Sequence, residues 1–239
     1  MNSKFQNGLT AIFLAAIMFS VVSCIPHIRG NGNVVKEERS LSNFEALEVS
    51  NGIEVLVTQD SIEKVIVETD SNIQKILKTE VSGGTLKIFM EEGVLHARQL
   101  RVYVTVKQLK SVDTGSGAHV KSESKINSTE LKMSSSSGSG IKMEVACDKL
   151  TAESSSGSHL KVEGTAKSLN ADSSSGASLD ASGLVAEKGE LSCSSGSHIQ
   201  AQITKEIKAE ASSGASINVT GNPTVRDTDS SSGGSVHFK

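Results

Sequence analysis

The chain contains very few aromatic residues. Of its 239 residues none is Trp, one is Tyr and six are Phe. Trp and Tyr dominate the strongest contact points of protein interfaces, so the composition disfavours a small, tight protein–protein hot spot. Charge of one sign is lacking too, because 24 Lys and Arg oppose 27 Asp and Glu. Without a basic stripe or an acidic tail, we expect no nucleic-acid partner.

Catalytic motifs are also missing. The sequence has no G-x-S-x-G elbow, no Walker loop and no calcium-binding Gly-Gly-x-Gly-x-Asp repeat. The pattern S-x-x-K occurs at Ser139 to Lys142 and at Ser158 to Lys161. That pattern is catalytic when a helical turn brings its Ser and Lys together, whereas in an extended strand the two point to opposite faces. We therefore expect a protein that is not an enzyme and has no cofactor.

The N-terminus has the features of an export signal. Lys4 precedes an apolar run from Leu9 to Val22, which is too short to span a bilayer. The segment that ends this run, Val21-Val22-Ser23-Cys24, resembles the lipobox of bacterial lipoproteins. We predict a lipoprotein signal peptide over residues 1–23, a lipid on Cys24 that binds the membrane, and an anchor and linker over residues 24–33. The alternative is an ordinary signal peptide with an incidental cysteine.

The residues that follow Cys24 bear on localisation. Surface export of bacterial lipoproteins often requires a run of acidic residues directly after the lipidated Cys. Here Ile25 to Gly30 contain no acidic residue, and the first acidic residues after Cys24 are Glu37 and Glu38. This favours an outer-membrane lipoprotein on the periplasmic face over one on the cell surface.

A repeat of about 19 residues fills the C-terminal half. Each copy has a run of small polar residues, a Gly, a small residue and an aliphatic residue two positions later. The glycines are Gly117, Gly138, Gly157, Gly176, Gly196, Gly214 and Gly233, which are 21, 19, 19, 20, 18 and 19 residues apart. A fixed period in this range is typical of a solenoid.

Within each repeat the apolar positions alternate with polar ones, as in a strand. Three residues after the glycines stand Val120, Ile141, Leu160, Leu179, Ile199, Ile217 and Val236. Five residues before them stand Val112, Met133, Ala152, Ala171, Leu191, Ala209 and Thr228. Stacking the coils about 4.8 Å apart buries these residues in one core. The pattern predicts an all-β fold, a right-handed parallel β-helix over residues 110–239.

Other columns of the repeat carry separate expectations. The serines directly before the glycines should form a buried hydroxyl ladder along the axis: Ser116, Ser137, Ser156, Ser175, Ser195, Ser213 and Ser232. On the outer face Lys121, Lys142 and Lys161 should stack beside Glu123, Glu144 and Glu163. Cys147 and Cys193 occupy different repeat positions, so we expect two free thiols, with Cys193 a small buried residue.

Residues 34–109 are rich in alternating segments but lack the repeat. We expect this β-rich region to cap one end of the β-helix, with one short helix from Asn72 to Glu80. The last coil, which ends after Phe238, should be open and could pair with a second copy in a homo-oligomer.

The N-terminal region also resembles a known family. The residues that carry the resemblance are Gly30-Asn31-Gly32-Asn33 with Val34 to Arg39, Phe44, Leu47 to Ile53, Val55, Val57 and Gln59, followed by the Ser-Gly-Ser and Ser-Gly-Ala repeats. Together they are similar to the putative auto-transporter adhesin head GIN domain family. The Gly-Ile-Asn of the family name reads Gly52-Ile53-Glu54 here. The resemblance implies an exported right-handed parallel β-helix and a role in adhesion, without a catalytic set.

Two polar columns remain as candidate sites. His119, His159 and His198 share a column in alternate coils, about 9.6 Å apart, which is too far to bind one metal. An acidic column, which sugar-cleaving enzymes would need, consists of Asp113, Glu153, Asp172, Glu210 and Asp229 and is interrupted by Ser134 and Ser192. We expect neither a metal site nor a catalytic site, and the sequence does not identify the binding residues.

These observations predict a cell-envelope lipoprotein that acts as a non-catalytic binding or adhesion module. Its partner would be an envelope protein or a polysaccharide. A structural role in the periplasm and a polysaccharide-active β-helix enzyme are the alternatives.

Overall fold

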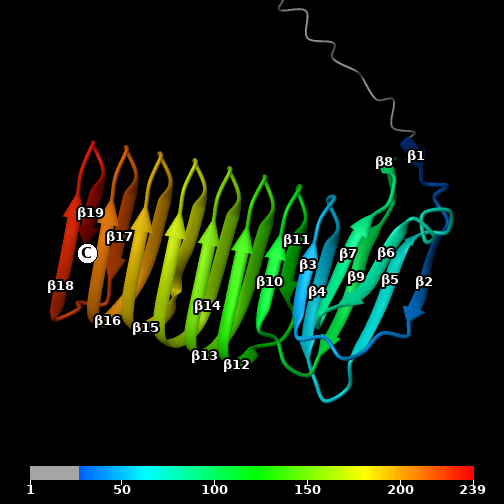
Figure 1. Ribbon diagram of the computed structural model, residues 1–239, viewed down its shortest axis with the longest axis horizontal. Coiled ribbons are helices and arrows are strands. Elements are labelled where there is room, and N and C mark those ends of the chain that lie inside the picture. Colours follow the sequence, from blue (N-terminus) through cyan, green and yellow to red (C-terminus); the bar gives the residue numbers. More distant parts are fainter. Residues whose placement is uncertain (1–26) are drawn as a thin grey trace, which may run out of the picture.

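The computed structural model describes residues 27–239 (Figure 1). This part of the chain consists of strands and turns without a helix, and so contains no helix that could cross a bilayer. All but two of the strands form two sheets that lie back to back and enclose the core. We call them the front sheet and the back sheet after their positions in Figure 1.

The repeats wind from one sheet to the other. Each coil has a front strand, a tight turn at the upper edge, a back strand and a lower corner that leads to the next coil (Figure 1). In the middle of the molecule a single long strand follows the back sheet, the corner and the front sheet: β13 (Gly140–Ser154), β14 (His159–Ser173), β15 (Ser178–Cys193) and β16 (His198–Ala211). These strands pair in parallel, as the period predicts, with Gly140 opposite His159 and His159 opposite Ser178.

The remaining strands extend both sheets to the two ends. The front sheet also contains β6 (Leu77–Ser82), β7 (Thr85–Met90), β3 (Ala46–Val49), β10 (Ser111–Thr114), β12 (Ile126–Ser135) and β18 (Val225–Ser230). The back sheet also contains β2 (Val34–Arg39), β5 (Lys64–Asp70), β9 (Leu100–Val106), β4 (Glu54–Gln59), β11 (His119–Ser122), β17 (Ser216–Thr220) and β19 (Ser235–Phe238). A separate two-stranded sheet joins β1 (His27–Arg29) to β8 (Gly93–His96).

The β-helix begins earlier in the chain than the repeats indicate. Strands β3 and β4 pair in parallel with β10 and β11, so residues 46–59 form a first coil. Beyond this coil the strands turn antiparallel: β5 with β9, β2 with β5, and β6 with β7. Antiparallel partners occupy the edges that another parallel coil would otherwise extend. Both sheets therefore continue without a break across residue 110.

The inward columns form the core. The residues three after the repeat glycines are at most 2% exposed from Val120 to Ile217, and those five before are buried from Val112 to Ala209. In the last coil Arg226 takes the inward position opposite Ile207, and its guanidinium lies 4.3 Å from the centre of the Phe238 ring. A cation thus lies over an aromatic ring at this end, where every residue of β18 is exposed, and a charge on an edge strand opposes further pairing.

The predicted ladder of serines before the glycines is wrong. These serines are exposed, because each takes a left-handed conformation with φ between 49° and 54°, followed by a Gly that also has positive φ. Two consecutive positive φ values make a tight turn, and alternation holds only within a strand. Buried hydroxyls occur instead in two neighbouring columns. Ser154 Oγ lies 2.9 Å from Ser158 Oγ, which donates to the carbonyl of Ser135 at 2.6 Å.

The predicted helix from Asn72 to Glu80 is also wrong. Residues 71–76 form turns, and Leu77 begins strand β6. The turns bury Ile73 and Ile76, which is the face that suggested a helix. The chain then extends because β6 pairs antiparallel with β7 and closes the edge of the front sheet.

Candidate functional site

A hollow lies on the lower front sheet. It has a volume of about 870 Å³ and is lined by residues of β12 and β13 and the segment before β10, including Asn127, Lys132, Lys149 and Thr151. A second hollow of about 530 Å³ continues from Lys149 across β14, β15, β16 and β18. The two share Lys149, so they form one shallow groove that runs along the axis of the β-helix.

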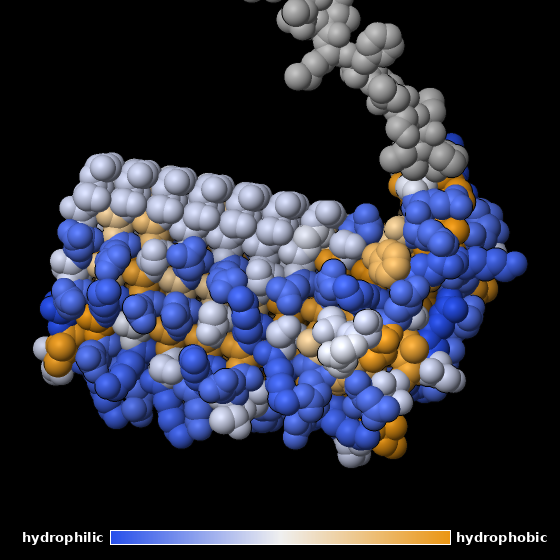
Figure 2. Space-filling model, in the orientation of Figure 1, coloured by the Kyte–Doolittle hydropathy of each residue, from blue (hydrophilic) through white to orange (hydrophobic). Residues whose placement is uncertain are grey.

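Two register columns form the walls of this groove. One column contains Glu130, Lys149, Ser168, Lys188, Glu206 and Val225, and the other contains Lys132, Thr151, Asn170, Glu190, Lys208 and Asp227. Between them lies an inward column with Leu131, Leu150, Leu169 and Ile207. Figure 2 shows hydrophobic patches among hydrophilic residues on the lower part of the visible face.

Most charges in the groove are neutralised locally. Lys132 pairs with Glu153 at 2.9 Å, and Lys188 pairs with Glu206 at 2.7 Å. The hydrogen bond to Glu153 raises the pKa of Lys132 above its ordinary value. Within residues 27–239, Lys149 is the groove lysine without an ion pair. Hydroxyl, amide and paired charged groups in a row suit an extended, uncharged or weakly anionic polar chain.

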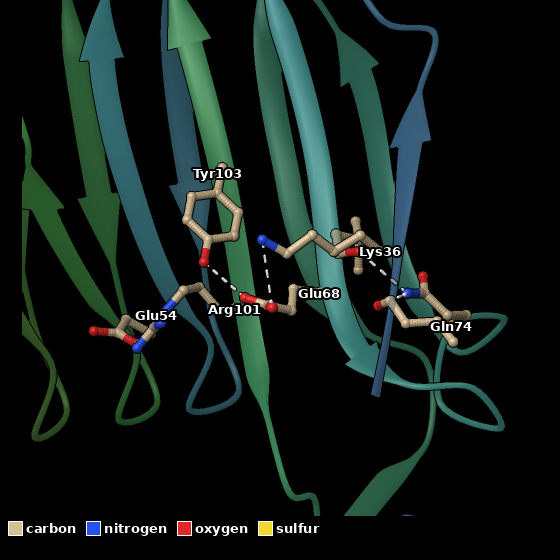
Figure 3. A network of polar contacts seen from close by, with 8 residues as sticks. Lys36, Glu54, Glu68, Gln74, Arg101 and Tyr103 are labelled. Atoms are coloured by element: carbon tan, nitrogen blue, oxygen red, sulfur yellow. Dashed lines mark hydrogen bonds and ion pairs between the residues drawn. The ribbon is translucent and has the colours of Figure 1, made fainter. Parts of the chain in front are cut away.

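A second polar cluster lies on the back sheet near the capped end (Figure 3). Tyr103 donates a hydrogen bond to Glu68 at 2.7 Å, and Lys36 Nζ lies 3.5 Å from the same carboxylate and 4.8 Å from the ring centre of Tyr103. Arg101 holds Glu54 through its Nε, at 2.7 Å, and its Nη2, at 2.6 Å. Each carboxylate therefore has a partner already, so this arrangement is a stable surface patch and offers no free general base.

Of the two columns that resemble catalytic or metal sites, the acidic one borders the groove and the histidine one lies on the other sheet. The acidic column lies on the outer side of the front sheet, where Glu153 pairs with Lys132 and Glu210 with Lys208. Burial, only partly offset by a hydrogen bond from Ser111, raises the pKa of Asp113. The three column histidines lie on the back sheet, and residues 27–239 contain no cluster of three metal-binding side chains.

The other sequence-predicted residues fall as follows. Ser139 is buried while Lys142 is exposed, so the S-x-x-K pair does point to opposite faces. Cys147 and Cys193 are free thiols, and Cys193 is buried as predicted. Cys24 lies outside the described residues.

The outer Lys and Glu columns form two of the three expected pairs. Lys121 contacts Glu123 at 2.6 Å and Lys161 contacts Glu163 at 3.1 Å. Glu144 instead pairs with Lys125 at 3.1 Å.

The upper edge of the molecule is a ridge of stacked turns, which Figure 2 shows as a pale band of nearly uniform hydropathy. In each turn the Gly N–H donates to the carbonyl of the Ser in the next turn, at 3.0–3.2 Å, from Gly52 to Ser116 through Gly214 to Ser232. The first turn, Asn51-Gly52, has the same pair of positive φ values, 61° and 70°. Gly52-Ile53-Glu54 is therefore the first step of the ridge, and sequence reasoning missed it because the capping strands separate it from the repeats.

Several solved structures are similar to this chain, among them the following three. A "putative adhesin" from Bacteroides fragilis has 19% identity and a TM-score of 0.83, with 89% of this chain and 100% of that chain covered. A "putative lipid binding protein" from Parabacteroides distasonis has 19% identity and a TM-score of 0.73, covering 90% and 100%. A "putative adhesin" from Parabacteroides merdae has 19% identity and a TM-score of 0.71, covering 89% and 99%. These likenesses establish the fold.

A search among curated proteins finds no match. A family model matches residues 43–223, which span the first coil, the capping strands and most of the repeats. The names of these structures describe adhesion and lipid binding. From this match over most of its length, the chain belongs to the family described as "Putative auto-transporter adhesin, head GIN domain".

Proposed function

We propose that the protein is a lipid-anchored, non-catalytic binding module of the bacterial envelope that holds an extended polysaccharide strand in the groove of the front sheet. The groove carries this proposal. It crosses the strands of several coils and presents a polar or charged side chain at nearly every step of about 4.8 Å. A linear polymer with a regular repeat can contact such a surface at several coils at once.

The chemistry of the groove supports a polysaccharide over a protein segment. Thr151, Ser168 and Asn170 offer hydroxyl and amide groups, and Lys149 offers one cation to a carboxylate or phosphate on the sugar chain. The groove residues include no aromatic side chain, so each sugar would be held weakly. Affinity would then come from contacts made by many coils together.

The location follows from the N-terminal segment. A lipid on Cys24 would hold the domain at a membrane, and the lack of acids directly after Cys24 supports the periplasmic face of the outer membrane. On that face peptidoglycan is a polysaccharide within reach.

The test is co-sedimentation with purified peptidoglycan sacculi, with immobilised lipopolysaccharide as a second polymer. Asn170→Trp and Thr151→Trp place bulk in the groove, while Asn218→Trp on β17 places the same bulk on the back sheet as a matched control. We expect the groove variants to lose at least about tenfold in binding and the control to bind like the unchanged protein. Equal binding by all three variants, or no binding to either polymer, would refute the proposal.

A further inference from the structure

The first described strand begins three residues after Cys24. Strand β1 pairs with β8 from His27 onward, and the N–H of Gly30 donates to the carbonyl of His96 at 2.7 Å. Residues 27–33, which the sequence assigned to a linker, are thus part of the domain.

A buried carboxylate fixes this segment to the capping strands. Asp70 is fully buried and accepts hydrogen bonds from the N–H groups of Gly32, at 2.5 Å, and Arg98, at 2.8 Å. Asn72 donates to the carbonyl of Arg29 at 2.9 Å and accepts from the N–H of Asn31 at 3.0 Å. These hydrogen bonds fix residues 29–32 to the capping strands, so this segment does not lengthen the tether to Cys24.

The short tether limits how far the domain can stand from its lipid. Three Cα–Cα steps join residue 24 to residue 27, and they span at most about 11 Å. This inference rests on the proposed lipid at Cys24. The polar headgroup layer of a bilayer is itself several ångströms thick. With the lipid in the bilayer, a tether of at most about 11 Å therefore keeps the end of the domain that carries β1 and β8 at the headgroups.

The surface at this end suits a bilayer. Arg29 and Arg98 are exposed, and neither has an ion pair within residues 27–239. Beside them is a hollow of about 530 Å³ lined partly by apolar residues, including Met90, Val94 and Leu100. Two acids lie nearby: Glu91 is paired with Lys78 at 2.8 Å, and Glu92 is exposed.

We propose that the capped end of the β-helix is seated on the membrane that holds the lipid of Cys24, with Arg29 and Arg98 at the lipid phosphates. The opposite end, with Arg226 and Phe238, then points away from the bilayer (Figure 1). The short tether from Cys24 to His27 brings this end to the bilayer surface, and electrostatic attraction between the two arginines and the lipid phosphates keeps it there.

The absence of Trp allows a clean test. A single Trp is introduced at Glu92 beside β8, or at Ser232 in the last turn as the distal control; both positions are exposed. The full-length lipidated protein is reconstituted in vesicles of phosphatidylcholine and phosphatidylglycerol that contain brominated lipids, and Trp quenching is measured. We expect quenching of Glu92→Trp to be at least about threefold stronger than that of Ser232→Trp. Equal quenching overturns the proposal.

Two further variants separate its parts. Arg29→Gln with Arg98→Gln should reduce quenching at position 92 toward the distal level, while Lys167→Gln with Lys205→Gln on the repeats should not. Unchanged quenching in the arginine variant overturns the phosphate contact. Mass spectrometry of the Cys24 peptide tests the proposed lipid independently, and if it is absent, a maleimide lipid coupled to Cys24 supplies the anchor for the same measurement.

Discussion

Asp70→Asn tests the physical account of the capped end. The side chain of Asp70 is fully buried and both of its carboxylate oxygens accept backbone hydrogen bonds, one from Gly32 and one from Arg98. Asn has nearly the same shape but only one acceptor oxygen. Its amide nitrogen would therefore face one of these N–H donors and leave it without a partner.

The expected loss of stability is about 2–4 kcal/mol. A hydrogen bond to a charged group contributes about 1.5–3 kcal/mol, and a buried donor without a partner costs about 1–3 kcal/mol. Asp148→Asn serves as the control, because Asp148 is exposed and pairs with Lys167 at the surface. Removal of that pair should change the free energy of unfolding by no more than about 0.5–1 kcal/mol.

The Asp70→Asn variant also gives a pH test. Burial alone would raise the pKa of Asp70, but the backbone hydrogen bonds of Arg98 and Gly32 outweigh it, so the pKa lies below the ordinary 3.8. The folded state therefore binds this proton more weakly than the unfolded state. The stabilisation is fully present above pH 3.8 and is lost as the pH falls through the pKa of the folded protein.

The assay is urea unfolding of the unchanged protein and the Asp70→Asn variant between pH 3 and pH 7, with hydrogen exchange of the Gly32 and Arg98 amides as a local readout. The difference in the free energy of unfolding between the two proteins should be constant near neutral pH and shrink in acid. A variant as stable as the unchanged protein at pH 7, or one with unchanged protection of both amides, would refute the reasoning.

Three further predictions concern the β-helix itself. Gln59→Ala should lower the free energy of unfolding, measured in urea, by about 2–3 kcal/mol. The Gln59 amide accepts a hydrogen bond from the N–H of Asn127 at 2.7 Å and donates one to its carbonyl at 3.0 Å. An unchanged free energy of unfolding would show that water replaces these bonds. Gly189→Ala places a Cβ 2.7 Å from Ile203 Cδ1 and should cost about 1–3 kcal/mol, with Ile203→Val in the same chain restoring part of it in a double-mutant cycle; additive effects would contradict the contact. Burial and the nearby Asp148 raise the pKa of Cys147 to about 11, so its reaction with a thiol reagent should be slow at pH 7 and rise about tenfold per pH unit up to pH 10; a fast reaction at pH 7 would be evidence against that environment.

Alternation along a strand was sufficient to predict the core columns. Leu160, Leu179 and Ile199 are buried because each lies within a strand whose side chains alternate between core and solvent. The same rule failed for Ser175, which lies one step beyond the strand in a left-handed turn. The residue type does not show which serines of a Ser-rich run are buried, because only the geometry of the turn decides this.

Two other features depend on partners distant in sequence. The turns around Ile73 and Ile76 bury a helix-like face, but antiparallel pairing with β7 decides where the chain extends. The groove could not be predicted from the sequence. Lys142 and Lys149 both lie in β13 at polar positions, but Lys142 belongs to the back sheet and Lys149 to the front sheet, and only the structure shows the corner between them. The Asn51-Gly52 pair was the one missed signal, since Asn-Gly favours the positive φ values found there.

The insertion of the capping strands between the first coil and the second lengthens the loop that the first coil-to-coil interface must close. Ala46 pairs with Ser111 across 65 residues, whereas each later coil closes over about 19, as from Gly140 to His159. Loop closure over the longer distance costs about 1 kcal/mol more. The first interface is therefore more costly to close than any later one, because each later coil closes over a single repeat. Loss of the last coil would shorten the molecule by one strand spacing and leave that first interface intact.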